Sequence, residues 1–139
     1  GTFKGLAFQI YDAGYDVWLG NNRGNAFSMM WADGTDARHS DEFWDFTFDE
    51  MAHYDVPAMV GKVINVTGKE NLAYVAHSQG TMQFLISASM PELRSRVADR
   101  VSVFVALSPV AWLRSVTALL FQVASQSRTL VKALGLAFP

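Results

Sequence analysis

Apolar and polar positions near the start of the chain follow first the period of a helix and then that of a strand. Residues 2–13 place apolar side chains at helical spacing, and Gly14 stands where a C-terminal cap belongs. The apolar run 15–20 predicts a short strand that ends at a glycine. The stretch 21–43 is polar and contains glycines, which predicts a long loop of the kind that often carries function.

Helical spacing returns after this loop. Thr47 and Glu50 have the spacing of a capping box, which opens a helix. Asp55 and Pro57 are residue types favoured at a helix start, so they predict a second helix with Asp55 as its N-cap and Gly68 at its end. The expected buried face of this helix consists of Met59, Val60, Val63 and Ile64.

The rest of the pattern predicts strand, helix, strand and helix in turn. Residues 71–76 form an apolar run with β-forming side chains, and helical spacing follows at 79–90. Residues 101–108 form another buried run, and the pattern after Pro109 is helical again. The order α-β-α-β-α-β-α predicts an α/β fold, with a parallel sheet and helices on both faces. Functional loops in such folds lie at the carboxyl ends of the strands.

Ser78 stands at the predicted junction of a strand and a helix, in the sequence AHSQG. A serine at so sharp a turn has a strained backbone and a hydroxyl that points out of the sheet. The residues two before and two after it must be small, which Ala76 and Gly80 satisfy. The N–H of Gln79 would then face an oxyanion formed when Ser78 attacks a carbonyl. Ser78 is therefore a candidate nucleophile, and the alternative is a plain strand-helix turn.

A nucleophilic serine needs a histidine as its base, usually oriented by an acid. The histidines are His39, His53 and His77. His77 adjoins Ser78, and neighbouring side chains on a tight turn point apart. No histidine follows Ser78, although α/β-hydrolases place theirs after the serine and the acid. We therefore expect the chain to be a fragment, with the acid, the histidine and the second oxyanion donor outside it.

Composition narrows the class of protein. The chain has 139 residues, half of them hydrophobic, which suits one domain or part of a larger one. Its net charge of −2, without a basic run, argues against a nucleic-acid partner. With no cysteine, disulfides and thiolate metal sites are excluded. The first residues do not resemble a signal peptide, and the apolar stretch 101–113 is short for a membrane span.

Other motifs favour structural interpretations. The spacing of GNNRGN matches no phosphate-binding loop, so Asn21, Arg23 and Asn25 are expected to hold a loop near the site. The aromatic residues between 43 and 48 are expected in the core rather than in contact with lipid. His39 has acidic neighbours but no further suitable ligand, so we expect neither a metal nor a cofactor. Residues 65–67 read Asn-Val-Thr, a glycosylation sequence used only in a secretory protein.

Four stretches together resemble one family. They are DAGYDVWLGNNRGN (12–25), DEFWDFTFDEMAHYDVPAMV (41–60), AHSQG (76–80) and ALSPVA (106–111). They resemble the acid lipase family, which includes gastric and lysosomal acid lipases and fungal and plant lipases acting on steryl esters or triacylglycerols. The serine motif of that family usually begins with glycine. Ala76 is a mild departure, because the demand at this position is steric.

The resemblance implies hydrolysis of neutral lipid esters at a lipid–water interface, without a cofactor, by a Ser-Asp-His triad. Ser78 matches the nucleophile and Gln79 the backbone oxyanion donor, while the family's Asp, His and first oxyanion residue have no counterpart here. It also implies a partial α/β-hydrolase core at 1–108 and the start of an inserted cap at 109–139. Members of the family are lysosomal, secreted or associated with lipid droplets or membranes, so the compartment stays open, as does the choice between triacylglycerol and steryl ester.

Two hypotheses from different classes remain. In the first, the chain is the nucleophile-bearing piece of a lipid ester hydrolase. In the second, it belongs to a catalytically inactive α/β-hydrolase-fold domain that binds lipid or protein. An acyltransferase or thioesterase would share the serine motif and is a third, weaker alternative. An Asp followed by a His in the sequence after Pro139 would support the hydrolase.

Overall fold

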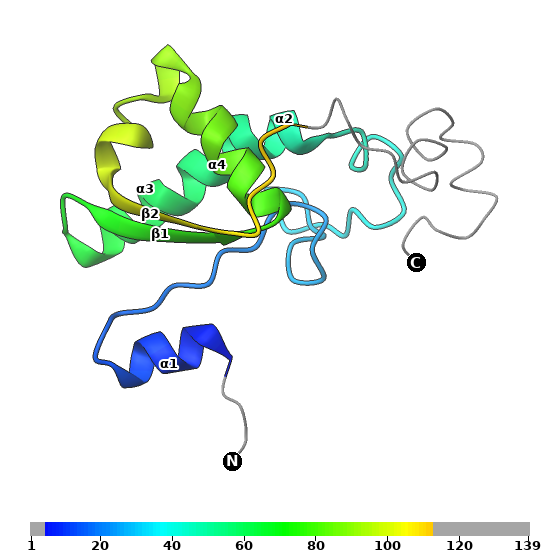
Figure 1. Cartoon of the computed structure of the whole chain (residues 1–139). Helices are drawn as coiled ribbons and strands as arrows, with labels where there is room; N and C mark the ends of the chain where they lie inside the picture. Colours follow the sequence, from blue (N-terminus) through cyan, green and yellow to red (C-terminus); the bar gives the residue numbers. More distant parts are fainter. Residues whose placement is uncertain (1–4, 113–139) are drawn as a thin grey trace. The chain divides into compact units, whose positions relative to one another are not determined.

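A computed structural model of the chain describes residues 5–112 (Figure 1). Contacts divide the chain into Gly1–Pro109 and Val110–Pro139, and all regular elements described below belong to the first unit. In order they are α1 (Leu6–Asp12), α2 (Phe48–Glu50), the π-helical segment η1 (Met51–Asp55), α3 (Val56–Thr67), β1 (Leu72–His77), α4 (Gln79–Ser89), the 3-10 turns η2 (Pro91–Leu93) and η3 (Ala98–Arg100), and β2 (Val101–Leu107). The helix expected after Pro109 lies largely outside the described residues.

The two strands are parallel neighbours in one sheet. Ala76 pairs with Ala106, and His77 pairs with Leu107 at the carboxyl end of both strands. A parallel pair needs a crossover, which α4 and the two 3-10 turns provide between β1 and β2. This is the strand-helix-strand order that the sequence predicts, and it places the end of β1 at the functional edge of the sheet.

The core lies between one face of the sheet and the helices α3 and α4, which Figure 1 shows on the same side of the strands. Phe84 of α4 stacks on Phe104 of β2, with ring centroids 4.1 Å apart, and lies 4.8 Å from the ring of Tyr74 on β1. Val56 and Val60 of α3 are fully or almost fully buried in the same cluster. Each such side chain contributes about 1.5–3 kcal/mol by leaving water.

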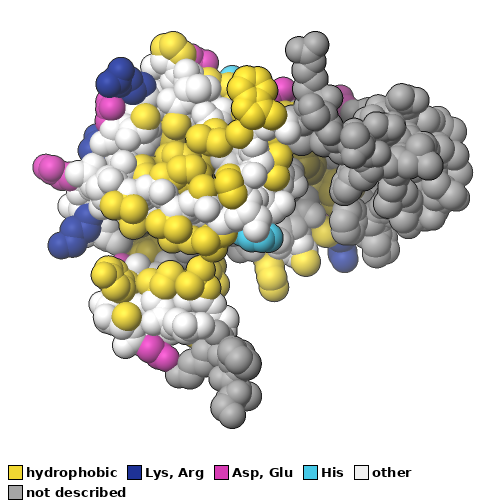
Figure 2. All heavy atoms as spheres, in the orientation of Figure 1, with side chains coloured by type: hydrophobic (Ala, Val, Ile, Leu, Met, Phe, Trp, Pro, Cys, Tyr) yellow, Lys and Arg dark blue, Asp and Glu magenta, His cyan; other side chains and the backbone are white. Residues whose placement is uncertain are grey.

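Apolar side chains on the other face of the sheet remain partly exposed. Val75 is 42 %, Val103 53 % and Val105 39 % exposed. Hydrophobic side chains also reach the surface elsewhere, as Figure 2 shows for one side of the molecule. The predicted second layer of helices therefore stays a prediction. No helix within residues 5–112 is long and apolar enough to cross a membrane.

The strand predicted at 15–20 is wrong, since these residues are irregular in the structure. A strand requires a neighbour to accept and donate its backbone hydrogen bonds, and residues 5–112 supply none for this segment. The glycine that ends the run lies close to α3. A Cβ on Gly20 would come 2.2 Å from the sulfur of Met59, so a larger residue here would require the Met59 side chain to move.

The second helix is present as α3, which begins at Val56 with Pro57 in its first turn, but the cap predicted at Asp55 is wrong. Asp55 has helical dihedral angles and makes no side-chain cap, so one helical run continues from α2 through η1 into α3. The predicted start at Thr47 is confirmed, because its hydroxyl accepts the N–H of Asp49 and the Glu50 carboxylate accepts the N–H of Thr47. The predicted end is confirmed too, with Gly68 in the left-handed conformation at φ 67°.

Candidate active site

Ser78 lies in the turn between β1 and α4 with φ 52° and ψ −120°. This backbone region is costly for a residue with a Cβ, by about 1–3 kcal/mol. Hydrogen bonds hold the turn on both sides. The Ser78 N–H donates to the Leu107 carbonyl at 3.0 Å, and the Ser78 carbonyl accepts the N–H and the hydroxyl of Thr81 at 3.0 and 2.6 Å. The serine is therefore fixed to the end of β2 and to the first turn of α4.

The two small residues around the serine face each other. A Cβ built on Gly80 would lie 3.6 Å from the Cβ of Ala76, which is an ordinary van der Waals contact. Ala76 itself is buried. The turn thus has room for one methyl group on each side and for little more. This explains why alanine can stand where the serine motif of acid lipases usually has glycine.

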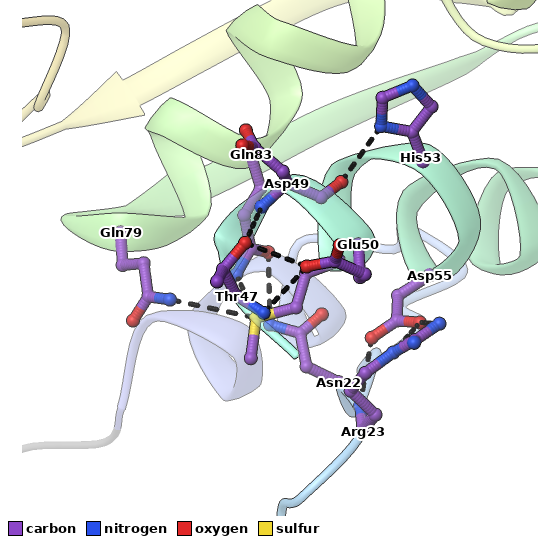
Figure 3. A network of polar contacts seen from close by, with 10 residues as sticks. Asn22, Arg23, Thr47, Asp49, Glu50, His53, Asp55, Gln79 and Gln83 are labelled. Carbon is purple, nitrogen blue, oxygen red and sulfur yellow. Dashed lines mark hydrogen bonds and ion pairs between the residues drawn. The ribbon is translucent and has the colours of Figure 1, made fainter. Parts of the chain in front are cut away.

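Gln79 is the first residue of α4, directly after Ser78. The first N–H groups of a helix have no partner within it and carry the positive end of the helix dipole. The main chain of Gln79 is therefore suited to donate to a developing negative charge. The Gln79 side chain points away to the η1 segment, where its amide contacts the Met51 sulfur at 3.6 Å (Figure 3).

A buried amide one turn further along α4 joins the site to the loop 21–43. Gln83 is 2 % exposed. Its nitrogen donates to the Met51 sulfur at 2.9 Å, and its oxygen accepts the Asn22 amide at 3.0 Å (Figure 3). Met51 thus receives contacts from both glutamines, and Asn22 links the start of the loop to the helix that follows Ser78.

The same loop is tied to the helical run by an ion pair. The Arg23 guanidinium donates to Oδ1 of Asp55 through Nε at 2.9 Å and Nη2 at 2.7 Å, and its backbone N–H donates to Oδ2 at 2.9 Å. The guanidinium also lies over the rings of Phe46 and Tyr54, 5.8 and 5.5 Å from their centroids. Asp55 is free to make these bonds because it does not cap a helix.

A family model described as the alpha/beta hydrolase fold matches residues 2–135. The chain belongs to the α/β-hydrolase fold family. It is 48 % identical to human lysosomal acid lipase/cholesteryl ester hydrolase over 107 residues, which are 76 % of this chain and 25 % of the relative. It is also 48 % identical to rat gastric triacylglycerol lipase over 107 residues (76 % and 26 %) and 42 % identical to human lipase member K over 130 residues (93 % and 31 %).

These relatives support the acid lipase family within the α/β-hydrolases, as the sequence motifs indicate. The chain spans about a quarter of the length of the first two of them. In these relatives the chain therefore extends well beyond the region that matches this sequence.

No histidine within residues 5–112 makes a hydrogen bond to Ser78. His53 on η1 places Nδ1 3.1 Å from the Asp49 carbonyl oxygen and Nε2 3.9 Å from a Glu92 carboxylate oxygen. His39 lies exposed in the loop beside Asp36, whose pKa falls to about 2 mainly because its carboxylate accepts hydrogen bonds from Arg38.

The aromatic residues of the loop pack against one another. Phe43 makes edge-on contacts with Trp31, Trp44 and Phe46, at centroid distances of 5.2–6.3 Å. Three of them, Trp31, Phe43 and Phe46, border a cavity of about 350 Å³ that is also lined by Arg23 and Asp55 but not by Ser78. Within residues 5–112 no group of His, Asp and Glu side chains is arranged to hold a metal ion.

Local sequence patterns do not reveal the part that three residues, Met51, Asp55 and Gln83, play in this arrangement. The sequence predicts that Arg23 holds the loop, but its partner is 32 positions away, and no local pattern marks such a pair. Gln83 looks like a helix-surface residue in sequence, and only its burial reveals the bridge to Asn22. A π-helical segment such as η1 often lies near a functional site, but its sequence carries no distinct signal.

Proposed function

We propose that this chain is the nucleophile-bearing part of a serine ester hydrolase that acts on neutral lipid esters. The observation that carries the proposal is the backbone of Ser78, held at φ 52° and ψ −120° between a parallel strand and a helix. A strained polar residue at the carboxyl edge of a sheet is the arrangement expected of a nucleophile in this fold. The names of the relatives, a cholesteryl ester hydrolase and a triacylglycerol lipase, support the substrate class.

In the proposed mechanism, Ser78 Oγ attacks the carbonyl carbon of the ester while a histidine takes the hydroxyl proton. The carbonyl oxygen becomes an oxyanion and accepts the N–H of Gln79 at the N-terminus of α4. The histidine then gives the proton to the leaving alcohol, and water releases the fatty acid from the serine. This histidine, its acid and the second oxyanion donor belong to parts of the protein outside residues 1–139.

The same proposal covers domain organisation and surroundings. Residues 1–108 form a partial α/β-hydrolase core, and residues 109–139 begin a cap inserted over the site. The substrate is a triacylglycerol or a steryl ester, so the enzyme works at a lipid–water interface. The relatives named lysosomal and gastric favour a protein that passes through the secretory pathway.

The test compares two serines in the full-length protein. Ser78→Ala should remove labelling by a fluorophosphonate probe and lower hydrolysis of a neutral lipid ester by about three orders of magnitude or more. Ser108→Ala is the matched control, because Ser108 also has a positive φ of 46° and follows β2 at the same edge of the sheet. This control variant should keep both the labelling by the probe and the hydrolysis of the ester.

The outcomes separate the two hypotheses. Retained hydrolysis in Ser78→Ala would rule out Ser78 as the nucleophile. A wild-type protein that binds neutral lipid but neither reacts with the probe nor hydrolyses esters would instead favour the catalytically inactive binding domain.

A further inference from the structure

A buried amide on α4 lies one helical turn after Gln79, and the steps of the proposed hydrolysis do not use it. Gln83 follows Gln79 by four positions, so the two side chains share one face of the helix. We propose that Gln83 is a positioning residue, which holds the start of α4 so that the Gln79 N–H meets the oxyanion formed at Ser78. This role rests on the proposed ester hydrolysis, and Gln83 acts through Gln79 rather than on the substrate.

The surroundings of Gln83 explain why an amide is buried there. Gln83 is 2 % exposed, and both polar atoms of its amide have partners from other segments. Nε2 donates to the sulfur of Met51 on η1 at 2.9 Å, and Oε1 accepts the amide of Asn22 at 3.0 Å (Figure 3). Burying an amide costs free energy, and an apolar side chain could fill a buried helix position without that cost. What the glutamine adds is a connection from α4 to both segments.

The loop side of this connection depends on Gln83. The Asn22 side chain donates to Gln83, while its buried Oδ1 has no hydrogen-bond partner within residues 5–112. The next residue, Arg23, is fixed to Asp55 of η1 by an ion pair at 2.7 Å. The start of the loop and η1 therefore form one frame, and the Gln83 amide joins α4 to both parts of that frame.

The hydrogen bonds around Ser78 leave a separate task for Gln83. Thr81 fixes the Ser78 carbonyl to the first turn of α4, and the Leu107 carbonyl fixes the Ser78 N–H to the end of β2. Neither contact fixes α4 against η1. The side chains of Gln79 and Gln83 do so, because both amides reach the sulfur of Met51, at 3.6 and 2.9 Å.

A small movement of α4 is enough to affect the reaction. An oxyanion donor acts when it lies about 2.7–3.1 Å from the developing charge. A misplacement of about 1 Å can lower a rate by about a hundredfold. The Gln79 N–H belongs to the first residue of α4, so its position follows the position of the helix. Loss of the Gln83 contacts should therefore lower kcat although Gln83 stays away from the ester.

The experiment uses Gln83→Met in the full-length protein, because methionine has a similar length and makes neither hydrogen bond. Complete labelling with a fluorophosphonate counts the active sites. We expect kcat for a neutral lipid ester, per labelled site, to fall by about ten- to a hundredfold. KM should stay within about twofold, because the Gln79 N–H acts on the transition state. Fewer labelled sites with an unchanged kcat per site would show a purely structural role and overturn the proposal.

A second buried polar residue on α4 provides the matched control. Ser87 is 0 % exposed, and its hydroxyl has no hydrogen-bond partner within residues 5–112. Ser87→Ala should therefore keep kcat per labelled site within about twofold of wild type. An equal loss in Ser87→Ala and Gln83→Met would mean that any change to the buried side of α4 lowers the rate, which would overturn a specific role for Gln83.

Met51→Leu tests the same connection from η1 and serves if Gln83→Met fails to fold. Leucine has a volume similar to that of methionine but accepts no hydrogen bond. It should lower kcat in the same way, and the two losses should not add in the double variant, because both variants break one contact. An unchanged kcat in Met51→Leu, or full additivity in the double variant, would overturn the proposal.

The wild-type protein separates this inference from the function on which it rests. A wild type that neither reacts with the fluorophosphonate nor hydrolyses the ester would overturn the proposed hydrolysis and the role of Gln83 together. An active wild type whose Gln83→Met variant keeps its kcat would overturn the role of Gln83 alone.

Discussion

At the scale of single residues, the space around Ser78 decides which side chains the turn accepts. Ser78 has a Cβ and yet holds a positive φ, so its hydrogen bonds to the Leu107 carbonyl and from the Thr81 N–H must offset its strain. Between β1 and α4, a Cβ added to Gly80 would just reach van der Waals contact with the Cβ of Ala76. The identity of residue 80 is therefore a test of how closely β1 and α4 approach.

We expect Gly80→Ala to fold and to keep its reaction with a fluorophosphonate, because the added Cβ would lie 3.6 Å from Ala76. Its free energy of unfolding should equal that of the wild type or exceed it by about 0.5–1 kcal/mol, since alanine favours a helix over glycine. Gly80→Val places two further methyl groups in the same gap and should lose about 1–3 kcal/mol. Thermal unfolding of the full-length protein measures both. A valine variant as stable as the wild type would show that strand and helix have spare room.

At the scale of elements, one helical run from α2 to α3 holds the loop 21–43 in place. It presents Met51 to the two glutamines of α4 and Asp55 to Arg23 of the loop. The π-helical segment η1 contains both residues. The extra residue per turn in a π-segment changes which side chains share a face, so η1 sets the directions of these two contacts.

Asp55→Asn should weaken the attachment of the loop. The amide can keep one acceptor for Arg23, but the guanidinium loses its counter-charge, which we expect to cost about 1–3 kcal/mol for this partly buried pair. Asp36→Asn is the matched control, because Asp36 pairs with Arg38 in an exposed setting and solvent screens that pair. Limited proteolysis of residues 21–43 and denaturant unfolding measure the effect. Equal loss in both variants would contradict a special role for Asp55.

The start of the same helical run should respond to acid. The Glu50 carboxylate accepts hydrogen bonds from the hydroxyl and the N–H of Thr47, and these bonds lower the pKa of Glu50 from its ordinary value of 4.5. The stability that Glu50 contributes is therefore complete above that value and is lost as pH falls through the lowered pKa of the folded state. The difference in unfolding free energy between wild type and Glu50→Gln should be constant near neutral pH and shrink in acid. Denaturant unfolding at a series of pH values checks this, and a difference that grows in acid would reverse the sign of the linkage.

At the scale of the whole molecule, the sequence predicts what depends on neighbouring residues. The capping box of Thr47, the glycine end of α3 and the turn around Ser78 each rest on contacts within a few positions, and all three are present. The strand at 15–20 and the cap at Asp55 were wrong for one physical reason. A strand needs a neighbouring strand to pair with, and Asp55 binds Arg23, 32 positions away, instead of capping a helix. Both outcomes depend on residues that are distant in sequence, which a local pattern does not include.

Residues 1–139 alone should hydrolyse no ester at an enzymatic rate. No histidine follows Ser78 in the sequence, and without a base its hydroxyl stays protonated. A missing oxyanion donor would cost a further factor of about 10² to 10³. The exposed valines of the sheet, Val103 above all at 53 %, should also make the isolated piece self-associate. Light scattering measures the self-association, and turnover of a p-nitrophenyl ester measures the hydrolysis, each in comparison with the full-length protein. A monomer that turns over like the full-length protein would identify His39 or His53 as the base.

The hydrogen bond from the Ser78 N–H to the Leu107 carbonyl makes this amide a natural reporter of the sheet edge. Its hydrogen can exchange with solvent deuterium only when the ends of β1 and β2 separate. The exchange rate at this one amide therefore measures how often the carboxyl ends of β1 and β2 separate beneath the serine. If acylation of Ser78 holds these strand ends together more firmly, deuterium uptake at the amide slows. If acylation instead loosens the strand ends, uptake at the same amide becomes faster.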